Sequence, residues 1–253
     1  LFCETFETCR QAINVMRITV VSHHRRNRRE QTHRSRHQCF GNTGCDMCQG
    51  RLPDVRQTAK RIHKEGGVCA TFACDLADAH ATEDLVPCVL EEFGRLDVLV
   101  NSASIFEKST LAEGSLDVWD RHFAVNLKAP YILMRSFAHC AKQGSIVNIL
   151  DTHVSRNKTA YAAYLLSKKM LGELTRMAAV EFAPRIRVNA VAPGIILPPG
   201  SQTDGYLDRL ARQIPLQRKG NVENIAHAVL FLLENDYVTG QVIFEDGGEH
   251  LHG

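Results

Sequence analysis

Three residues in the middle of the chain have the types and spacing of an acid–base centre. Tyr164 and Lys168 lie four residues apart in a predicted helix, residues 160–182, and this spacing places both side chains on one face. A tyrosine, with an ordinary pKa of about 10, exchanges protons poorly at neutral pH, and a nearby ammonium group lowers that pKa. We therefore expect Lys168 to tune Tyr164. Asp151 follows a predicted strand, residues 145–150, and would lie where open α/β sheets bind ligands.

The elements that must position these residues follow an alternating order of helices and strands from about residue 53 onward. We expect helices over residues 54–66, 85–93, 116–136 (broken near Pro130), 160–182 and 222–233, and strands over residues 68–74, 96–101, 145–150, 187–192 and 241–244. Such alternation is typical of a parallel sheet wrapped by helices. The prediction is an α/β protein with a single Rossmann-like, doubly wound parallel sheet. Residues 195–220 have no clear period, as expected of a mobile substrate loop, and residues 195–206 would cover the substrate.

Several motifs in the same order resemble those of the short-chain dehydrogenase/reductase family, over residues 53–253. Besides Tyr164 and Lys168 they are Asp75-Leu76, Asn101-Ser102-Ala103-Ser104, Asn126, residues 187–194 ending in Pro193-Gly194, and residues 239–241 with 246–248. Tyr-x-x-x-Lys alone is a weak signal, because both residues are common on helix surfaces. Its specificity comes from the ordered set, although Ser102 stands where the family usually has asparagine.

The resemblance implies a nicotinamide cofactor and a role for each matching residue. The residues placed beside the cofactor are Asp75, Leu76, Asn101, Ser102, Ala103, Tyr164, Lys168, Pro193 and Gly194. Of these, Asp75 would contact the adenine and Lys168 would also hold the nicotinamide ribose. Asn126 would hold a water in a proton relay to Lys168. The family also implies a homotetramer joined through its long helices.

Within the family, the sequence most resembles the pteridine reductases at two positions. Asp151 stands where most members have serine, and Phe106 follows the turn that ends at Ser104. The resemblance implies hydride transfer from NADPH to a dihydropterin or dihydrofolate, with Ser104, Phe106, Asp151 and Tyr164 around the substrate. A flat pterin could stack on Phe106, and Tyr164 or Asp151 could supply the proton. Alternatively, Phe106 is an apolar loop anchor and Asp151 a helix or turn cap.

The N-terminal region lacks the glycine-rich turn with which the family binds the cofactor's phosphates. Residues 22–29 occupy its expected place and contain no glycine. We therefore predict an aberrant or poorly ordered segment over residues 1–52 in place of the first βαβ unit. A shifted reading frame would convert His and Arg codons there into Ile, Thr, Gly and Ala codons, a hypothesis that the coding DNA tests. The alternatives to a pterin reductase are a family enzyme acting on another carbonyl substrate and a scaffold with impaired catalysis.

Composition agrees with an ordinary globular protein. The apolar fraction is 44%, and no apolar run approaches the roughly 20 residues of a membrane span. Nine cysteines without regular spacing indicate reduced thiols, so we expect a cytoplasmic protein. Cys45 and Cys48, near His37 and Cys39, could bind zinc, but no second ligand pair follows, and we expect no metal. Residues 22–37 contain six arginines and no aromatic residue, which disfavours nucleic acid as a partner.

Overall fold

The computed structural model describes residues 60, 62–64, 68–197 and 204–251. The predictions for residues 1–52, including the missing glycine-rich turn and the Cys45 and Cys48 pair, lie outside the described residues. So does the middle of the predicted substrate loop, residues 198–203.

A four-stranded sheet forms the centre of the described structure. Its strands are β1 (Val98–Asn101), β2 (Gly144–Ile149), β3 (Ile186–Pro193) and β4 (Val242–Glu245), in the order β1-β2-β3-β4. Every neighbouring pair is parallel. The prediction of an α/β fold with a parallel sheet is confirmed, and the carboxyl ends of all four strands face the same edge.

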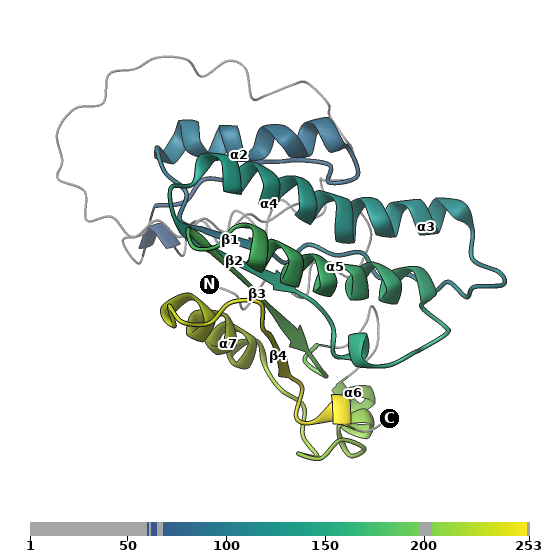
Figure 1. Ribbon diagram of the computed structural model, residues 1–253. Coiled ribbons are helices and arrows are strands. Elements are labelled where there is room, and N and C mark those ends of the chain that lie inside the picture. The colour runs from purple at the N-terminus through teal and green to yellow at the C-terminus, as the bar shows by residue number, and fades with distance from the viewer. Residues whose placement is uncertain (1–59, 61, 65–67, 198–203, 252–253) are drawn as a thin grey trace.

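Helices cover both faces of this sheet. The helices are α2 (Ala79–Phe93), α3 (Leu116–Phe123), α4 (Ala129–Cys140), α5 (Ala162–Glu181), α6 (Asp204–Ala211) and α7 (Val222–Glu234), with short 3-10 turns η4 (Thr152–Ser155) and η5 (Glu249–Leu251). Figure 1 shows α2, α4 and α5 on one face and α7 on the other, while α6 lies near the carboxyl end of β4. None of the described helices combines the length and the apolar composition that a membrane crossing requires.

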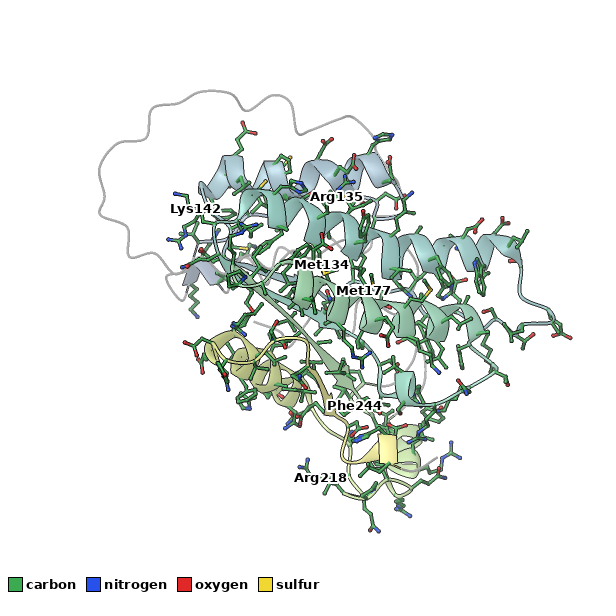
Figure 2. All side chains as sticks on the ribbon, viewed as in Figure 1. Met134, Arg135, Lys142, Met177, Arg218 and Phe244 are labelled. Atoms are coloured by element: carbon green, nitrogen blue, oxygen red, sulfur yellow. The ribbon has the colours of Figure 1, made fainter. Side chains whose placement is uncertain are left out.

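The strands bury side chains on both faces, as their nearly continuous apolar sequences require. Leu99 and Ile146 pack with the α2 and α4 helices, whereas the next residues, Val100 and Val147, pack against the α7 side. Side chains therefore fill the space above and below the sheet, and Met134 of α4 is buried in the cluster on the α2 and α4 side (Figure 2). This packing fixes the strand ends that carry the candidate site.

The predicted break near Pro130 takes the form of a π-helical segment. The segment η3 (Ala124–Lys128) joins α3 to α4, and the Ala129 N–H donates to the Ala124 carbonyl five residues earlier. Proline has no N–H, so the Asn126 carbonyl cannot receive the usual α-helical bond from residue 130. Such π segments often occur at functional sites, and this one contains Asn126.

Three sequence predictions differ from the structure. Residues 68–74 are not a strand, because no described segment pairs with them and a strand needs a hydrogen-bonded neighbour. Helix α2 begins at Ala79, earlier than predicted, since the Asp78 carboxylate accepts the N–H groups of His80 and Ala81 and caps the helix. Helix α6 lies within the region predicted to be irregular.

Candidate active site

Asp151 and Tyr164 meet at the carboxyl end of the sheet. Asp151 comes two residues after β2, and its Oδ1 accepts the backbone N–H of His153, which caps η4. Its Oδ2 accepts the hydroxyl of Tyr164 at 2.8 Å. Tyr164 lies in the first turn of α5 and is only 9% exposed. Asp151 is therefore a turn cap, as one alternative proposed, and also a partner of the tyrosine.

Lys168 lies one helical turn after Tyr164 and is 2% exposed. Its Nζ donates to the carbonyl of Ile149, the last residue of β2, at 2.8 Å. A buried ammonium group needs such polar contacts, because removal from water is costly. Lys168 thus ties α5 to the end of the strand from which Asp151 follows.

Asn126 is fully buried and joins three parts of the site. Its Oδ1 accepts the Ile105 N–H at 2.9 Å and the Ser104 hydroxyl at 3.2 Å. Its Nδ2 donates to the Ile105 carbonyl and the Ser167 hydroxyl, both at 3.1 Å. All four hydrogen-bonding positions of the amide are therefore used by protein groups. The side chain positions the loop after β1, and a bound water would have to use the main chain of Asn126.

The pKa of Tyr164 moves in the direction opposite to the prediction. Burial raises it well above the ordinary value, and the charge of Asp151 and the hydrogen bond to Asp151 raise it further. The pKa of Tyr164 is therefore raised, not lowered, and its hydroxyl donates to the carboxylate. That Lys168 tunes this pKa stays a prediction.

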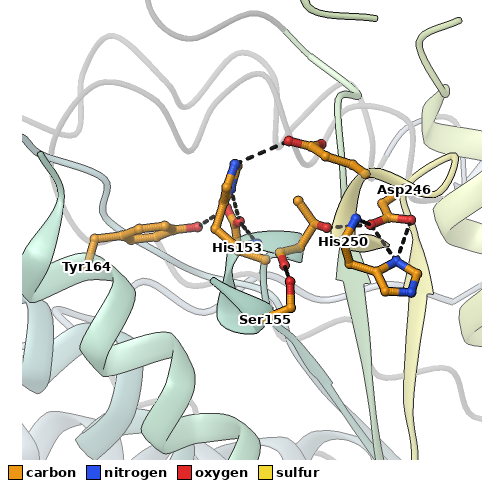
Figure 3. A network of polar contacts seen from close by, with 8 residues as sticks. His153, Ser155, Tyr164, Asp246 and His250 are labelled. Atoms are coloured by element: carbon orange, nitrogen blue, oxygen red, sulfur yellow. Dashed lines mark hydrogen bonds and ion pairs between the residues drawn. The ribbon is translucent and has the colours of Figure 1, made fainter. Parts of the chain in front are cut away.

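His153 explains why Asp151 remains ionised. Burial alone would raise the pKa of Asp151, but the hydrogen bonds and positive charge of His153, with the Tyr164 hydroxyl, lower it. His153 Nδ1 lies 2.6 Å from Asp151 Oδ1, and its Nε2 lies 3.2 Å from Glu249 Oε1 (Figure 3). The second contact has the distance of an ion pair but does not meet hydrogen-bond angles.

A second polar cluster fixes the chain next to this network. The Thr152 hydroxyl donates to Asp246 Oδ2, and the same carboxylate accepts the backbone N–H groups of Gly248 and His250 (Figure 3). The ring of His250 also stacks on Phe244 of β4, with centroids 4.3 Å apart. Thus η4 and η5 are connected through Asp246.

Phe106 lies beside the Tyr164 ring. Its ring meets that of Tyr164 edge-on at 4.7 Å and stacks on Tyr161 at 4.4 Å. It is 39% exposed, so part of the ring remains available to a ligand. The apolar anchor and the ligand-stacking interpretations are therefore compatible.

The loop that carries Phe106 is held by buried polar groups on both sides. Asn126 binds Ile105, and His122 Nε2 accepts the N–H of Glu107 at 3.2 Å. His122 Nδ1 lies 2.7 Å from the Val118 carbonyl, and burial lowers the pKa of the imidazole. A neutral ring with a proton on Nδ1 satisfies both contacts.

The remaining predicted cofactor residues lie along the same edge or just before α2. Asn101 ends β1, where its Nδ2 donates to Asn148 while its buried Oδ1 has no partner among the described groups. Ser102 and Ala103 follow it and are partly exposed, and Pro193 ends β3. A Cβ on Gly194 would lie 2.6 Å from that of Asp246, so only glycine fits there.

The adenine-side residues lie in the turn before α2. Asp75 accepts the N–H of Ala77 at 2.8 Å, and Leu76 is buried in the core. Three observations on the described residues fit a nicotinamide group. The Lys168 ammonium is buried, the buried Asn101 Oδ1 has no partner among the described groups, and the carboxyl ends of the strands lie at the same edge. The place for its phosphates would involve residues that the structure does not describe.

The chain is similar in sequence to known reductases. The sequence matches the family described as "Enoyl-(Acyl carrier protein) reductase" over residues 38–250. It is 37% identical to "3-oxoacyl-[acyl-carrier-protein] reductase FabG" of Thermotoga maritima, over 83% of this chain and 89% of the relative. It is 35% identical to "Pteridine reductase 1" of Leishmania tarentolae, over 66% of this chain and 67% of the relative.

A solved structure shares both fold and sequence. The FolM alternative dihydrofolate reductase 1 of Brucella suis, in complex with NADP, superimposes with a TM-score of 0.77 at 36% identity. The match covers 80% of this chain and 83% of that protein.

Proposed function

This chain belongs to the short-chain dehydrogenase/reductase family of oxidoreductases, and we propose that it is an NADPH-dependent reductase of a pteridine, either a dihydropterin or dihydrofolate. One observation carries the proposal: the Asp151 carboxylate accepts the Tyr164 hydroxyl beside the partly exposed ring of Phe106. A pterin offers a flat heteroaromatic ring with N–H and amino donors. The carboxylate and the phenylalanine ring complement these two properties.

The cofactor we propose is NADPH, since the Brucella suis relative is crystallised with NADP. When bound, it supplies the hydride. Tyr164, Lys168, Asn101, Ser102, Ala103, Pro193 and Gly194 would hold its nicotinamide half, and Asp75 and Leu76 its adenine. Residues 53–253 would form this catalytic domain, with residues 1–52 as the aberrant segment.

Tyr164 is the proposed proton donor. Its pKa is raised, so it retains the proton until a basic ring nitrogen of the substrate lies next to the hydroxyl. The proton then passes from Tyr164 Oη to that nitrogen, and Oη recovers a proton from solvent. Asn126 could support this return through a water on its main chain, beside Lys168. Asp151, with its lowered pKa, orients the tyrosine and substrate rather than supplying the proton.

Ser104 and Phe106 would complete the substrate site. Asn126 fixes Ser104 and the neighbouring backbone, so the Phe106 ring is presented by a constrained loop. Preorganised side chains bind a flat ligand with a smaller loss of entropy.

We also propose a cytoplasmic homotetramer. A largely apolar groove lies across α3, η3, α4 and α5. It is lined by Phe123, Leu127, Tyr131, Met170, Leu174 and Met177, with Ala124 and the charged residues Asp120, Lys128 and Glu173. Met170 and Met177 are 49% and 67% exposed, as expected of side chains that another subunit covers.

A second candidate function is reduction of an acyl thioester, which the similarity to the Thermotoga maritima 3-oxoacyl reductase favours. Assays of the purified protein distinguish these two candidate functions. Nicotinamide fluorescence first measures NADPH binding, and NADPH consumption is then followed with dihydropterin, dihydrofolate and a 3-oxoacyl thioester. We expect binding and faster turnover of a pteridine. Preference for the thioester would replace the proposed substrate, and absence of NADPH binding would indicate the impaired scaffold.

A further inference from the structure

His153 lies between two carboxylates that come from distant parts of the sequence. Asp151 approaches its Nδ1 at 2.6 Å, and Glu249 approaches its Nε2 at 3.2 Å. The side chains of Asp151, His153 and Glu249 are 21%, 23% and 10% exposed, so water screens these contacts only partly. The Glu249 Oε2 atom is buried and has no hydrogen-bond partner among the residues that the structure describes.

We propose that His153 is a positioning residue of the active site: as an imidazolium held by Glu249, it keeps Asp151 an ionised acceptor directed at the Tyr164 hydroxyl. This inference deepens the proposed reductase function and rests on it. The contacts run from Tyr164 through Asp151 and His153 to Glu249, and Figure 3 shows His153 between Tyr164 and the Asp246 and His250 pair.

The charges around His153 favour its protonated form. Asp151 faces it from the end of β2 and Glu249 from η5, whereas Lys158, before α5, opposes the imidazolium charge. Tyr164 of α5 reaches it only through Asp151. Burial lowers the pKa of His153, but the hydrogen bond to Asp151 and the contact with the Glu249 carboxylate outweigh it and raise the pKa to about 9.

The turn before Glu249 fixes the direction from which this carboxylate approaches. Gly247 and Gly248 adopt φ values of 64° and 85°, which favour glycine. Asp246 then accepts two N–H groups of the turn, and Thr152 connects it to η4. Residues 246–249 thereby lie next to η4 and His153.

The consequence for Asp151 follows from its surroundings. Burial raises the pKa of this carboxyl, and His153 is the main group that lowers it. Without His153, Asp151 would take up a proton at higher pH and could no longer accept from Tyr164 and from a substrate N–H. His153 therefore extends the active range of the enzyme toward low pH.

The first test needs no substrate or cofactor. Histidine labelled at the ring Cε1 is titrated by NMR in the ligand-free protein, and the His153 signal is identified by its loss in His153→Asn. We expect a pKa near 9, and lower values in Glu249→Gln and Asp151→Asn. A His153 pKa near the ordinary value of about 6.5 would overturn the proposal. His80→Asn, at a side chain that is 97% exposed, is the matched control and should leave the His153 signal unchanged.

The second test is the pH profile of kcat/KM for dihydropterin. Glu249→Gln retains the shape of the side chain and removes its charge, whereas His153→Ala removes both contacts. We expect the acid limb to move upward by about one pH unit or more in His153→Ala and by less in Glu249→Gln. A uniform loss of activity with an unshifted profile would indicate only a structural role and contradict the proposal.

The two tests separate this inference from the proposed function. Suppose that the protein reduces no pteridine, but that His153 titrates near 9 and its pKa falls in Glu249→Gln. The reductase function then fails, and the interaction of His153 with Asp151 and Glu249 stands. If the protein reduces a pteridine while the pKa of His153 is close to its ordinary value, the proposed role of His153 fails and the reductase function stands. Should His153→Ala not fold, the NMR titrations of the native protein and Glu249→Gln still decide the matter.

Discussion

The Tyr164 hydroxyl donates to Asp151 Oδ2 at 2.8 Å, and this contact adds to the effect of burial on the Tyr164 pKa and to the effect of His153 on the Asp151 pKa. The carboxylate raises the pKa of the phenol, and the phenol helps to lower the pKa of the carboxyl. The pair is therefore a proton donor with its acceptor, rather than two interchangeable acids.

Replacement of Tyr164 by phenylalanine should remove the proton donor and leave the fold intact. We expect kcat for pteridine reduction to fall by about 10²–10⁴-fold, the usual contribution of a positioned acid. The NADPH dissociation constant, measured by fluorescence titration, should change much less. A variant with native kcat would rule out Tyr164 as the donor.

Replacement of Asp151 tests the substrate preference. Asp151→Asn retains the shape but loses the charged acceptor, so kcat/KM for dihydropterin should fall by about tenfold to a hundredfold, the cost of about 1.5–3 kcal/mol for a charged hydrogen bond. Asp151→Ser introduces the residue that most of the family has and serves as the comparison. Activity with a 3-oxoacyl thioester should suffer less in Asp151→Ser than activity with dihydropterin. Equal losses for both substrates would contradict a pterin-specific role.

Phe106 can be tested through ring stacking. Phe106→Ala should raise KM for dihydropterin by about threefold to tenfold, because an aromatic contact contributes about 0.5–1.5 kcal/mol beyond its buried area. Phe106→Tyr keeps the ring and is the control, with a KM close to that of the native protein. If Phe106→Ala binds pterin normally, the ring is only a loop anchor.

The fold and the proximity of Tyr164 and Lys168 could be predicted because both depend on local sequence patterns, whereas their roles as an acid–base centre stay a prediction. Buried parallel strands have continuous apolar sequences, and the Tyr164 to Lys168 spacing is a property of one helix. His153 and Glu249 were missed because their contact joins residues far apart in the chain. The sequence offered one signal for His153, its position two residues after Asp151. His122 and Tyr161 were also missed, since their roles depend on how the loop around Phe106 folds back.

Where prediction from sequence failed, the deciding interaction was usually with another segment. Residues 68–74 have a strand-like composition, but a strand exists only with a paired neighbour. Pro130 signalled a helix break, yet the π turn that contains Asn126 depends on packing against α5 and the loop after β1. The direction of the Tyr164 pKa shift was mispredicted because neither the burial of the hydroxyl nor its contact with Asp151 was visible in the spacing.

The contacts of His153 with Asp151 and Glu249 predict that the free energy of unfolding depends on pH. The folded pKa is raised, so the stabilisation is complete below the unfolded value of about 6.5 and is lost as pH rises through about 9. We expect the free energy of unfolding in urea to fall by on the order of 2 kcal/mol more in native protein than in His153→Asn between about pH 6 and pH 10. The same decline in both proteins would mean that His153 contributes nothing.

Hydride transfer to a pteridine is tested most directly by isotope transfer. Protein is incubated with dihydropterin and NADPH deuterated at one or the other C4 position, and the product is analysed by mass spectrometry. We predict a tetrahydropterin that contains one deuterium on a ring carbon from one of the two cofactors, with little or none formed by Tyr164→Phe in the same time. If the native protein binds NADPH but yields no deuterated product from either cofactor, it does not reduce pteridines.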